Sequence, residues 1–494
     1  MYYGDLHCHP SFKPVNSIED ALHVSHPPDF YNSYSNNCSS IEGTLLNSFS
    51  KSVLKKSQSC IKQLVDGNVR IAFASLFPLE KQFTNPKLWL AGEKSKNRLI
   101  SCLTGMHPNK VGRLRNKEIN YFEELQAEYR LIKVASLTQN IFLPVNYSEL
   151  ENSLNTNSKI NFIINFEGIQ SLAKIDAYGK IDNSSILNNI DVVKSWQNPP
   201  FFITFNHHFS NGLAGHAHSL MSEMTKSSFL APSGVFGQKE LLAKGIEPLG
   251  YAVMTKLLEK ENGRKRILID IKHMSALARQ QFYKWHHDNY VIKEDNVPII
   301  CSHTGITSYN PSLAQLVESE KNESFYELDY KSTLHEWPIN LCAEDVQKIH
   351  KSGGLVGLQL DMKRICGKNM SNKLATKGYY TEQDQKKIIV KIVALNLLHM
   401  VRCVGNKTGW DILCIGSDND GFVSCIEGYE TSDKFPNLAN NLEKFFDNPE
   451  DIFHGPGSML ATHITELKHG YSGKQIVEKV FRDNVLTFLQ KHFN

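Results

Sequence analysis

Two histidines near the start of the chain have the spacing of metal ligands. His7 and His9 lie in the segment GDLHCHP at residues 4–10. Residues two apart in an extended strand point to the same face, so both imidazoles can approach one cation. An H-x-H pair is also common by chance, and alone it is weak support for a metal site. A metal centre here therefore requires further ligands from distant parts of the sequence.

Further histidines and carboxylates lie at the ends of later apolar runs. They are Glu167, His207, His273, His303 and Asp418. Each has an ordinary structural alternative, such as a surface loop carboxylate for Glu167, a core histidine for His273 or a helix N-cap for Asp418. Their joint occurrence at the ends of separate runs favours a metal centre, because imidazoles and carboxylates together suit divalent cations.

Eight apolar and β-branched runs predict the strands that would position these residues. The runs cover residues 2–9, 69–77, 160–167, 201–207, 266–273, 297–303, 354–361 and 412–418. Continuous runs of this kind are typical of parallel strands covered on both faces. Helical periodicity is present at residues 119–135, 386–401 and 472–492. Residues 99–106 fit either a ninth strand or a helix.

Strands that alternate with helices in this way predict an α/β fold, a (β/α)8 TIM-like barrel. The carboxyl ends of all the strands then meet on one face, around one axis. We expect a single domain over residues 1–494, with insertions at about 27–50, 208–250, 304–338 and 422–457. Each insertion follows a predicted strand, at the face where barrels place substrate-contacting loops.

Composition excludes several other classes of protein. The chain has 494 residues, 41% hydrophobic and 21% charged, with a formal net charge of +3. These values predict a globular protein with a large core and no nucleic-acid partner. The apolar runs are too short to span a membrane, and no signal peptide is recognised. Ten scattered cysteines without a C-x-x-C pair predict free thiols and a cytoplasmic location.

Six motifs carry a resemblance to a known family. They are GDLHCHP at 4–10, NFEG at 165–168, ITFNHHFSNGLAGHA at 203–217, IDIKHMS at 269–275, PIICSHTG at 298–305 and IGSDNDG at 415–421. In number and order they resemble the amidohydrolase superfamily, and more narrowly the membrane (renal-type) dipeptidases, peptidase family M19. The resemblance spans nearly the whole chain and implies the same barrel.

The resemblance also implies a role for each matching residue. His7 and His9 would bind one divalent ion, His273 and His303 a second, and Glu167 would bridge both. Asp418 would lie against the bridging water and relay its proton. The residues expected to bind substrate are His207, Asn340 and Asp420. Zinc is the default for such a site, with manganese or iron as alternatives.

The chain departs from the family pattern at several positions. The dipeptidases usually have H-x-D where this chain has His7 and His9, and a small residue where it has Lys272. The family's carboxylate-binding arginine, which precedes the residue matching Asn340, is absent. Arg364, Lys363 and Lys272 are the cations that could replace it. Three additional histidines form either a polar loop or a functional site, which would be an extra substrate contact or an adventitious metal site: His208, His216 and His218.

The function that these residues favour is hydrolysis of an amide in a dipeptide or a dipeptide-like small molecule. One alternative is a metal-dependent phosphoesterase or nuclease of the polymerase-and-histidinol-phosphatase (PHP) or TatD type, since these families also carry an early H-x-H. Another is a non-catalytic, metal-stabilised binding protein. The sequence leaves open the natural substrate and whether the chain forms a homodimer.

Overall fold

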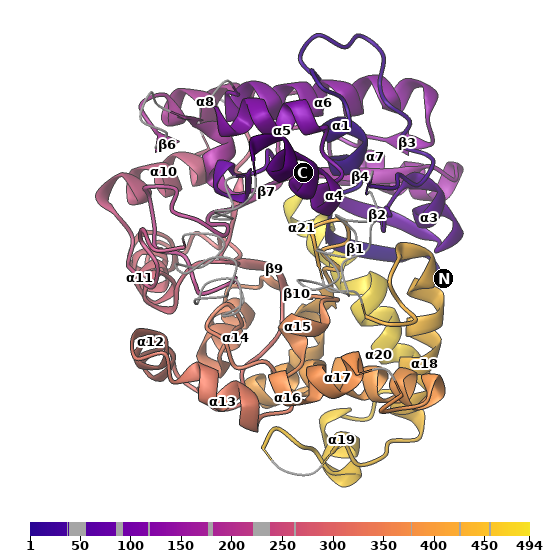
Figure 1. Cartoon of the computed structure of the whole chain (residues 1–494). Coiled ribbons are helices and arrows are strands. Elements are labelled where there is room, and N and C mark those ends of the chain that lie inside the picture. The colour runs from indigo at the N-terminus through magenta and orange to yellow at the C-terminus, as the bar shows by residue number, and fades with distance from the viewer. Residues whose placement is uncertain are drawn as a thin grey trace.

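The computed structural model describes residues 1–36, 38, 56–84, 92–116, 119–175, 181–220, 238–260, 263–376, 378–423, 426–453 and 456–494. Its centre is a sheet of parallel strands, and helices such as α6, α11 and α17 lie around it (Figure 1). The strands along the sheet follow the order of the chain: β1 (Tyr3–Cys8), β2 (Val69–Leu76), β4 (Ile160–Glu167), β7 (Phe202–Thr204), β8 (Leu268–Asp270), β9 (Ile300–Thr304), β10 (Leu355–Leu358) and β11 (Leu413–Ile415). The predicted TIM-like barrel is confirmed.

The last strand returns to the first and closes the barrel. The backbone N–H of Asp418 donates to the carbonyl of His7 over 2.8 Å, and the N–H of His9 donates to Asn419 over 2.8 Å. Asp5 adds a side-chain link, because its carboxylate accepts from the backbone and the hydroxyl of Ser417. The two ends of the sheet are therefore joined where His7 and Asp418 lie.

The apolar runs form strands because both faces of the sheet are covered. All eight residues of β4 and all six of β1 are buried. β4 matches the predicted run at 160–167, whereas β7 and β8 are only three residues long. The runs predicted at 201–207 and 266–273 are longer than β7 and β8, because the chain leaves the sheet before it reaches His207 and His273.

The helices begin and end with recognisable signals. α17 (Glu382–Val404) begins after Thr381, whose side chain accepts from Asp384, and ends at Gly405 with a left-handed φ of 78°. The other long predicted helix is α6 (Tyr121–Thr138). The predicted helix at 472–492 is interrupted: α20 (Gly473–Glu478) and α21 (Asn484–His492) flank a π-helical turn. Residues 99–106 form no strand, because most of them belong to α4 (Glu93–Thr104).

Shorter elements complete the described part of the chain. The remaining helices are α1 (Phe12–Asn16), α3 (Ile61–Asp66), α5 (Pro108–Arg115), α7 (Tyr147–Thr156), α8 (Ile186–Lys194), α10 (Pro248–Leu258), α11 (Ala276–His286), α12 (Leu313–Lys321), α13 (Phe325–Lys331), α14 (Ala343–Lys351), α15 (Met362–Ile365), α16 (Lys368–Ala375), α18 (Phe435–Asp447) and α19 (Ala461–Leu467). β3 (Ile141–Phe142) pairs with β4, and β5 (Lys174–Ile175) pairs with β6 (Ile181–Asp182). None of these helices, nor any other in the described ranges, has the length and apolarity to cross a membrane.

The four predicted insertions are described to different extents. The segment at 304–338 contains α12 and α13. Much of 27–50, residues 221–237 of the insertion at 208–250, and four residues of 422–457 lie outside the described ranges. The arrangement of one domain with four insertions stays a prediction.

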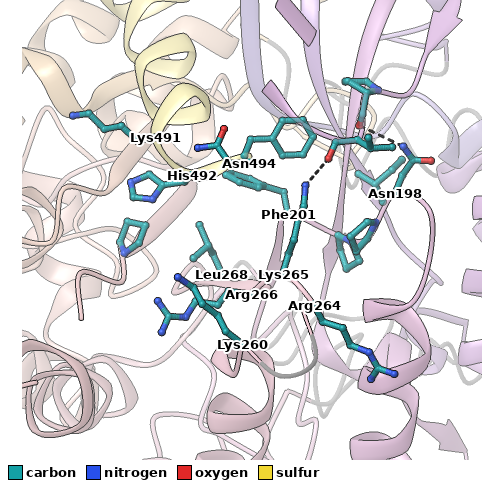
Figure 2. A pocket seen from close by; sticks show the side chains of 18 of the residues that line it. Asn198, Phe201, Lys260, Arg264, Lys265, Arg266, Leu268, Lys491, His492 and Asn494 are labelled. Carbon is teal, nitrogen blue, oxygen red and sulfur yellow. Dashed lines mark hydrogen bonds between the residues drawn. The ribbon is translucent and has the colours of Figure 1, made fainter. Parts of the chain in front are cut away.

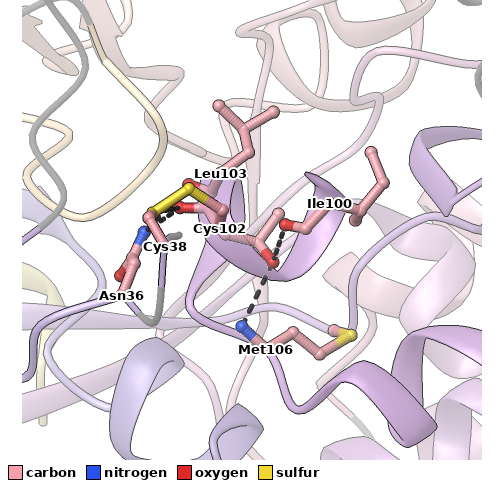
Figure 3. Close-up of a disulfide and its surroundings, with 7 residues drawn as sticks. Asn36, Cys38, Ile100, Cys102, Leu103 and Met106 are labelled. Atoms are coloured by element: carbon pink, nitrogen blue, oxygen red, sulfur yellow. Dashed lines mark hydrogen bonds between the residues drawn. A yellow bond between two sulfur atoms is a disulfide. The ribbon is translucent and has the colours of Figure 1, made fainter. Parts of the chain in front are cut away.

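Two of the cysteines form a disulfide rather than free thiols. Cys38 is bonded to Cys102 near the end of α4, with 4.8 Å between their Cα atoms (Figure 3). Asn36 supports the link, because its side-chain amide donates to the Cys102 carbonyl over 2.8 Å. Disulfides persist mainly in oxidising compartments. The expectation of free thiols is wrong for this pair, and the cytoplasmic location stays a prediction.

A buried ion pair joins two of the outer helices. Arg279 of α11 donates to both carboxylate oxygens of Asp345 on α14, over 3.0 and 3.2 Å. Asp345 also accepts from the Tyr283 hydroxyl and the Cys342 backbone. Both charged side chains are at most 1% exposed. Removal of one partner would leave the other charge buried and unpaired.

We expect Arg279→Met to lower the free energy of unfolding by about 3–5 kcal/mol, because Asp345 loses its counterion inside the protein. Urea denaturation followed by circular dichroism measures this. Lys284→Met on the same helix is the matched control, since it breaks only an exposed pair with Asp288 and should cost less than about 1 kcal/mol. Equal effects of the two substitutions would contradict the prediction.

Candidate metal centre

Glu167 lies at the carboxyl end of β4, between four imidazoles. Its carboxylate oxygens are 3.1 to 3.5 Å from the Nε2 atoms of His7, His9, His273 and His303. All five side chains are buried. The structure thus brings together residues that are as much as 296 positions apart, by placing the ends of β1, β4, β8 and β9 around one axis.

The imidazoles form two pairs. The Nε2 atoms of His7 and His9 are 3.2 Å apart, and those of His273 and His303 are also 3.2 Å apart. Asp418 contacts both pairs: one oxygen is 3.4 Å from His9, and the other is 3.9 Å from His303. Two imidazole pairs that share a carboxylate offer ligands for two cations.

The polar atoms of this cluster fit a divalent cation. Glu167 Oε1 is buried and has no hydrogen-bond partner. The ligand atoms of His7, Glu167, His303 and Asp418 all lie within 4.8 Å of one another. A buried carboxylate oxygen without a donor is costly, and a cation would satisfy it. Nitrogen and oxygen donors in this mixture suit zinc and other first-row metals.

A hydroxyl shared by two histidines sets which ring nitrogens carry protons. Ser302 donates to Asp270 over 2.6 Å. Its oxygen lies 3.0 Å from Nδ1 of His7 and 2.8 Å from Nδ1 of His303. Because the hydroxyl proton is already committed to Asp270, Nδ1 of His303 donates to Ser302, and Nδ1 of His7 donates to the oxygen of Ser302 or to that of Ser75, which lies 3.1 Å away. Both Nε2 atoms are then left without a proton and directed at Glu167, as metal ligation requires.

The same logic applies to His9, whose Nδ1 lies 2.9 Å from the Ser75 carbonyl. A carbonyl can only accept, so this Nδ1 carries a proton and Nε2 faces Glu167. Asp270 is itself held by four donors, including Thr204. Asp5 instead joins β1 to β11, and its burial raises its pKa to about 6.

The carboxylates of the cluster favour positive charge beside them. Burial tends to lower the pKa of His9, but the Asp418 and Glu167 carboxylates outweigh it and raise this pKa to about 10. Burial tends to raise the pKa of Glu167, but the surrounding histidines hold it well below its usual range. A proton on His9 or a divalent cation can supply the charge that these carboxylates attract.

Two of the centre's residues have a left-handed backbone. The φ angles of His273 and Asp418 are 66° and 60°. Non-glycine residues adopt this region at a cost, and the surrounding structure must hold them there. At these positions the chain leaves β8 and β11 and turns the side chains toward the barrel axis. Strain of this kind is common in active sites.

His207 lies beside the cluster and is held by a residue that the sequence analysis missed. Its Nδ1 is 2.5 Å from Glu80 Oε2, and its Nε2 is 3.7 Å from Glu167. Glu80 also accepts from the Phe209 backbone. Burial tends to lower the pKa of His207, but the carboxylates of Glu80 and Glu167 raise it. The only feature of the sequence that could have identified Glu80 is its position, four residues after the end of β2.

The structure places Asn340 and Asp420 in hydrogen bonds within the protein. Asp420 accepts from the backbones of Gln58 and Ser59. Asn340 accepts from the Gly305 backbone and donates to the carbonyls of His335 and Arg364. Their role in substrate binding stays a prediction, and these contacts indicate a positioning role for loops at the barrel mouth.

Lys272 is connected to Asp418 through a second residue that the sequence analysis missed. The Lys272 side chain is buried, with Nζ 3.5 Å from Gln359 Oε1. The Gln359 amide donates to Asp418 over 2.7 Å. Burial lowers the pKa of Lys272 to about 8. Lys272 therefore faces the site side of the barrel.

Of the three additional histidines, His208 lies nearest the centre. Its ring centroid is 4.8 Å from that of His273, and its Nδ1 is 2.7 Å from the Ser219 hydroxyl. Arg364 donates to the Ser219 carbonyl and so lies on the same side. His216 contacts the Glu240 carbonyl, and His218 is 3.7 Å from Glu320. These last two contacts indicate structural roles.

Comparison of the sequence with known proteins gives a short match. The chain matches no known protein-family model. Over 61 residues, 12% of this chain, it is 39% identical to dipeptidase tcpJ from Claviceps purpurea (strain 20.1). The matched stretch covers only 13% of that protein.

Solved structures give a match over most of the chain. The probable dipeptidase PvdM from Pseudomonas aeruginosa aligns over 88% of this chain and 90% of its own, with a TM-score of 0.50 and 14% identity. The chain shares the fold of PvdM. A metallopeptidase from Rhodobacter sphaeroides, liganded with a phosphinate mimic of the dipeptide L-Ala-D-Ala, aligns over 100% of this chain and 99% of its own, with a TM-score of 0.48 and 12% identity.

We expect Ser302→Ala to weaken the binding of Zn²⁺ about 10- to 100-fold, because His7 and His303 lose the acceptor that fixes their tautomers. Competition with a chromogenic chelator measures the affinity. Ser136→Ala is the control, since that hydroxyl contacts only a carbonyl of its own helix. Unchanged Zn²⁺ affinity in a folded Ser302→Ala variant would contradict the prediction.

Proposed function

We propose that this protein is a metal-dependent hydrolase that cleaves an amide bond in a dipeptide or dipeptide-like substrate. The observation that supports this most is the buried Glu167 carboxylate, placed between two imidazole pairs with Asp418 beside both. The shared fold with PvdM and the short match to dipeptidase tcpJ favour the same substrate class.

The proposed cofactor is a pair of divalent ions, with zinc as the first choice and manganese or iron as alternatives. His7 and His9 would bind one ion, His273 and His303 the other, and Glu167 both, with Asp418 as a further ligand. Bound divalent ions lower the pKa of a water molecule and polarise a carbonyl oxygen. In this proposal, protein side chains carry out the other steps, which are proton transfer and stabilisation of the oxyanion.

In this proposal Asp418 moves the proton. Hydrolysis adds water across the amide, so the C–N bond breaks and the leaving amine gains a proton. Asp418 accepts that proton from water and delivers it to the nitrogen. Gln359 orients Asp418 for this task, because its amide donates to one carboxylate oxygen over 2.7 Å. The other oxygen faces His9.

His207 would stabilise the negative charge that develops on the carbonyl oxygen. Its Nδ1 contacts Glu80, and its Nε2 is directed toward the cluster. A donor fixed in a buried site before the reaction stabilises an oxyanion effectively. Lys272 and Arg364 are the cations on this side of the barrel that could receive a substrate carboxylate in place of the family's arginine.

Two other functions compete with this proposal. A phosphoesterase or nuclease would use similar metal ligands, and it would turn over a phosphoester. A non-catalytic metal-stabilised protein would bind metal and turn over neither class. Activity on a panel of dipeptides beside p-nitrophenyl phosphate separates the three.

We expect Asp418→Asn to lower kcat/KM for the best dipeptide at least about 100-fold, because the amide cannot accept the proton from water. Steady-state kinetics and metal analysis of the same preparation measure this. Asp411→Asn is the control, since Asp411 forms a partly exposed pair with Lys479 on the outside of the barrel. Turnover of p-nitrophenyl phosphate without dipeptide hydrolysis in the unmodified enzyme would exclude the proposal.

His207→Gln should lower kcat about 100-fold while KM changes little, because one oxyanion donor is lost. Glu80→Gln should give a smaller loss in the same direction, since His207 keeps a hydrogen-bond partner but loses its charged one. Kinetics on the same dipeptide test both variants. A change confined to thermal stability, with kcat retained, would assign this pair a structural role.

A further inference from the structure

A cavity lies at the opposite end of the barrel from Glu167. It has a volume of about 470 Å³ and is lined by Phe201, Leu268 and Pro298, which stand at or just before the first residues of β7, β8 and β9. The end of α21 forms another wall (Figure 2). Because the candidate metal centre occupies the carboxyl ends of the strands, this cavity is a separate site.

Cationic side chains gather around this cavity. They are Lys260, Arg264, Lys265, Arg266 and Lys491, with His492 beside them. None of the lining side chains in the described ranges is acidic. The whole chain carries a formal charge of only +3, so five cations around one cavity are a local concentration of positive charge. Such a concentration attracts anions.

The two arginines already have acidic partners. Arg264 is 2.9 Å from Asp191, and Arg266 donates to Asp295. The three lysines differ, because no carboxylate lies within 4.0 Å of Lys260, Lys265 or Lys491 in the described ranges. The lysines are therefore the charges available to a ligand.

Lys265 is the most enclosed of these lysines. Its Nζ donates to the Val145 carbonyl over 2.6 Å and lies 5.3 Å from the Phe493 ring centroid. Burial lowers the pKa of Lys265, with Glu149 as the one nearby carboxylate that opposes this shift. Glu149 is itself engaged, because it accepts from the Val145 backbone. A partly buried ammonium without a close counterion would be stabilised by an anion.

Apolar residues also line the cavity. Phe201, Phe493 and Leu268 line it together with several prolines. Its volume is in the range of small-molecule sites, which combine apolar walls with a few polar groups. Lysine binds phosphate as a point charge and does not need the planar geometry that arginine offers. The lysines indicate a ligand with an anionic group, and the apolar lining indicates that the rest of the ligand is apolar.

We propose that this cavity binds a small organic phosphate, with the phosphate near Lys265, Lys260 and Lys491 and the apolar part against Phe201 and Phe493. The site is independent of the candidate metal centre and of the reaction proposed there. Lysine ammonium groups bind phosphate as point charges, and the apolar residues of the lining would contact the rest of the ligand.

Isothermal titration calorimetry of the metal-loaded, full-length protein with AMP tests this proposal. We expect AMP to bind, adenosine and inorganic phosphate each to bind at least about tenfold more weakly, and the AMP affinity to fall as salt is raised. Lys265→Met should weaken AMP at least about tenfold. Lys491→Met provides a second variant on the exposed rim, in case Lys265→Met affects folding. Lys474→Met, an exposed lysine of α20 outside the cavity, should leave the affinity unchanged.

Several outcomes would overturn the proposal. The absence of heat with AMP at millimolar concentration would do so. So would AMP affinity that is unchanged in both Lys265→Met and Lys491→Met, since the nucleotide would then bind elsewhere. Equal affinity for inorganic phosphate and AMP would remove the role of the apolar wall. Tighter binding of citrate than of AMP would replace phosphate by carboxylate as the ligand class.

Discussion

The buried negative charge of Glu167 is the constraint on which the centre depends. A carboxylate inside a protein is stable only beside positive charge or strong donors. Here four imidazoles lie 3.1 to 3.5 Å from it, supplied by three other strands, and Oε1 has no hydrogen-bond donor, so the arrangement calls for a cation between the rings and the carboxylate. The barrel brings the ends of these strands to one axis, so the positions of the ligand atoms depend on the register of the whole sheet.

A second buried carboxylate, that of Asp270, supports the histidines of this centre through hydrogen bonds. Asp270 accepts a hydrogen bond from the Ser302 hydroxyl, and the Ser302 oxygen in turn accepts hydrogen bonds from Nδ1 of His7 and Nδ1 of His303. Asp270 thereby fixes, through Ser302, the orientation of two imidazole rings that belong to different pairs. The two pairs are consequently coupled through hydrogen bonds as well as through Glu167. A change at Ser302 reaches both, although it contacts neither proposed ion.

Much of this could be predicted from the sequence, because strand ends in a parallel barrel meet on one face. β4 and its terminal Glu167 match the prediction residue by residue. Glu80, Ser302 and Gln359 were missed, since their roles depend on side-chain contacts that no spacing encodes. The left-handed turn at His273 was missed because a histidine gives no sequence signal for a positive φ, and the Cys38–Cys102 bond was missed because a separation of 64 residues does not show that two cysteines are close in space. The contacts of Asp420 with Gln58 and Ser59 could not be predicted either, because adjacency to Asp418 in a motif does not fix where a side chain points, and its role in substrate binding stays a prediction.

The closure of β1 against β11 has a consequence for how the protein is made. The contact between Ser417 and the His7 carbonyl spans 410 positions of sequence. Chains are synthesised from the N-terminus, and domains fold as their residues emerge. Until residues 417–419 have been synthesised, the His7 and His9 backbones lack these partners, and β1 has an open edge. The centre can be completed only after that point, so a chain interrupted before residue 418 lacks one of the two carboxylates that contact both imidazole pairs.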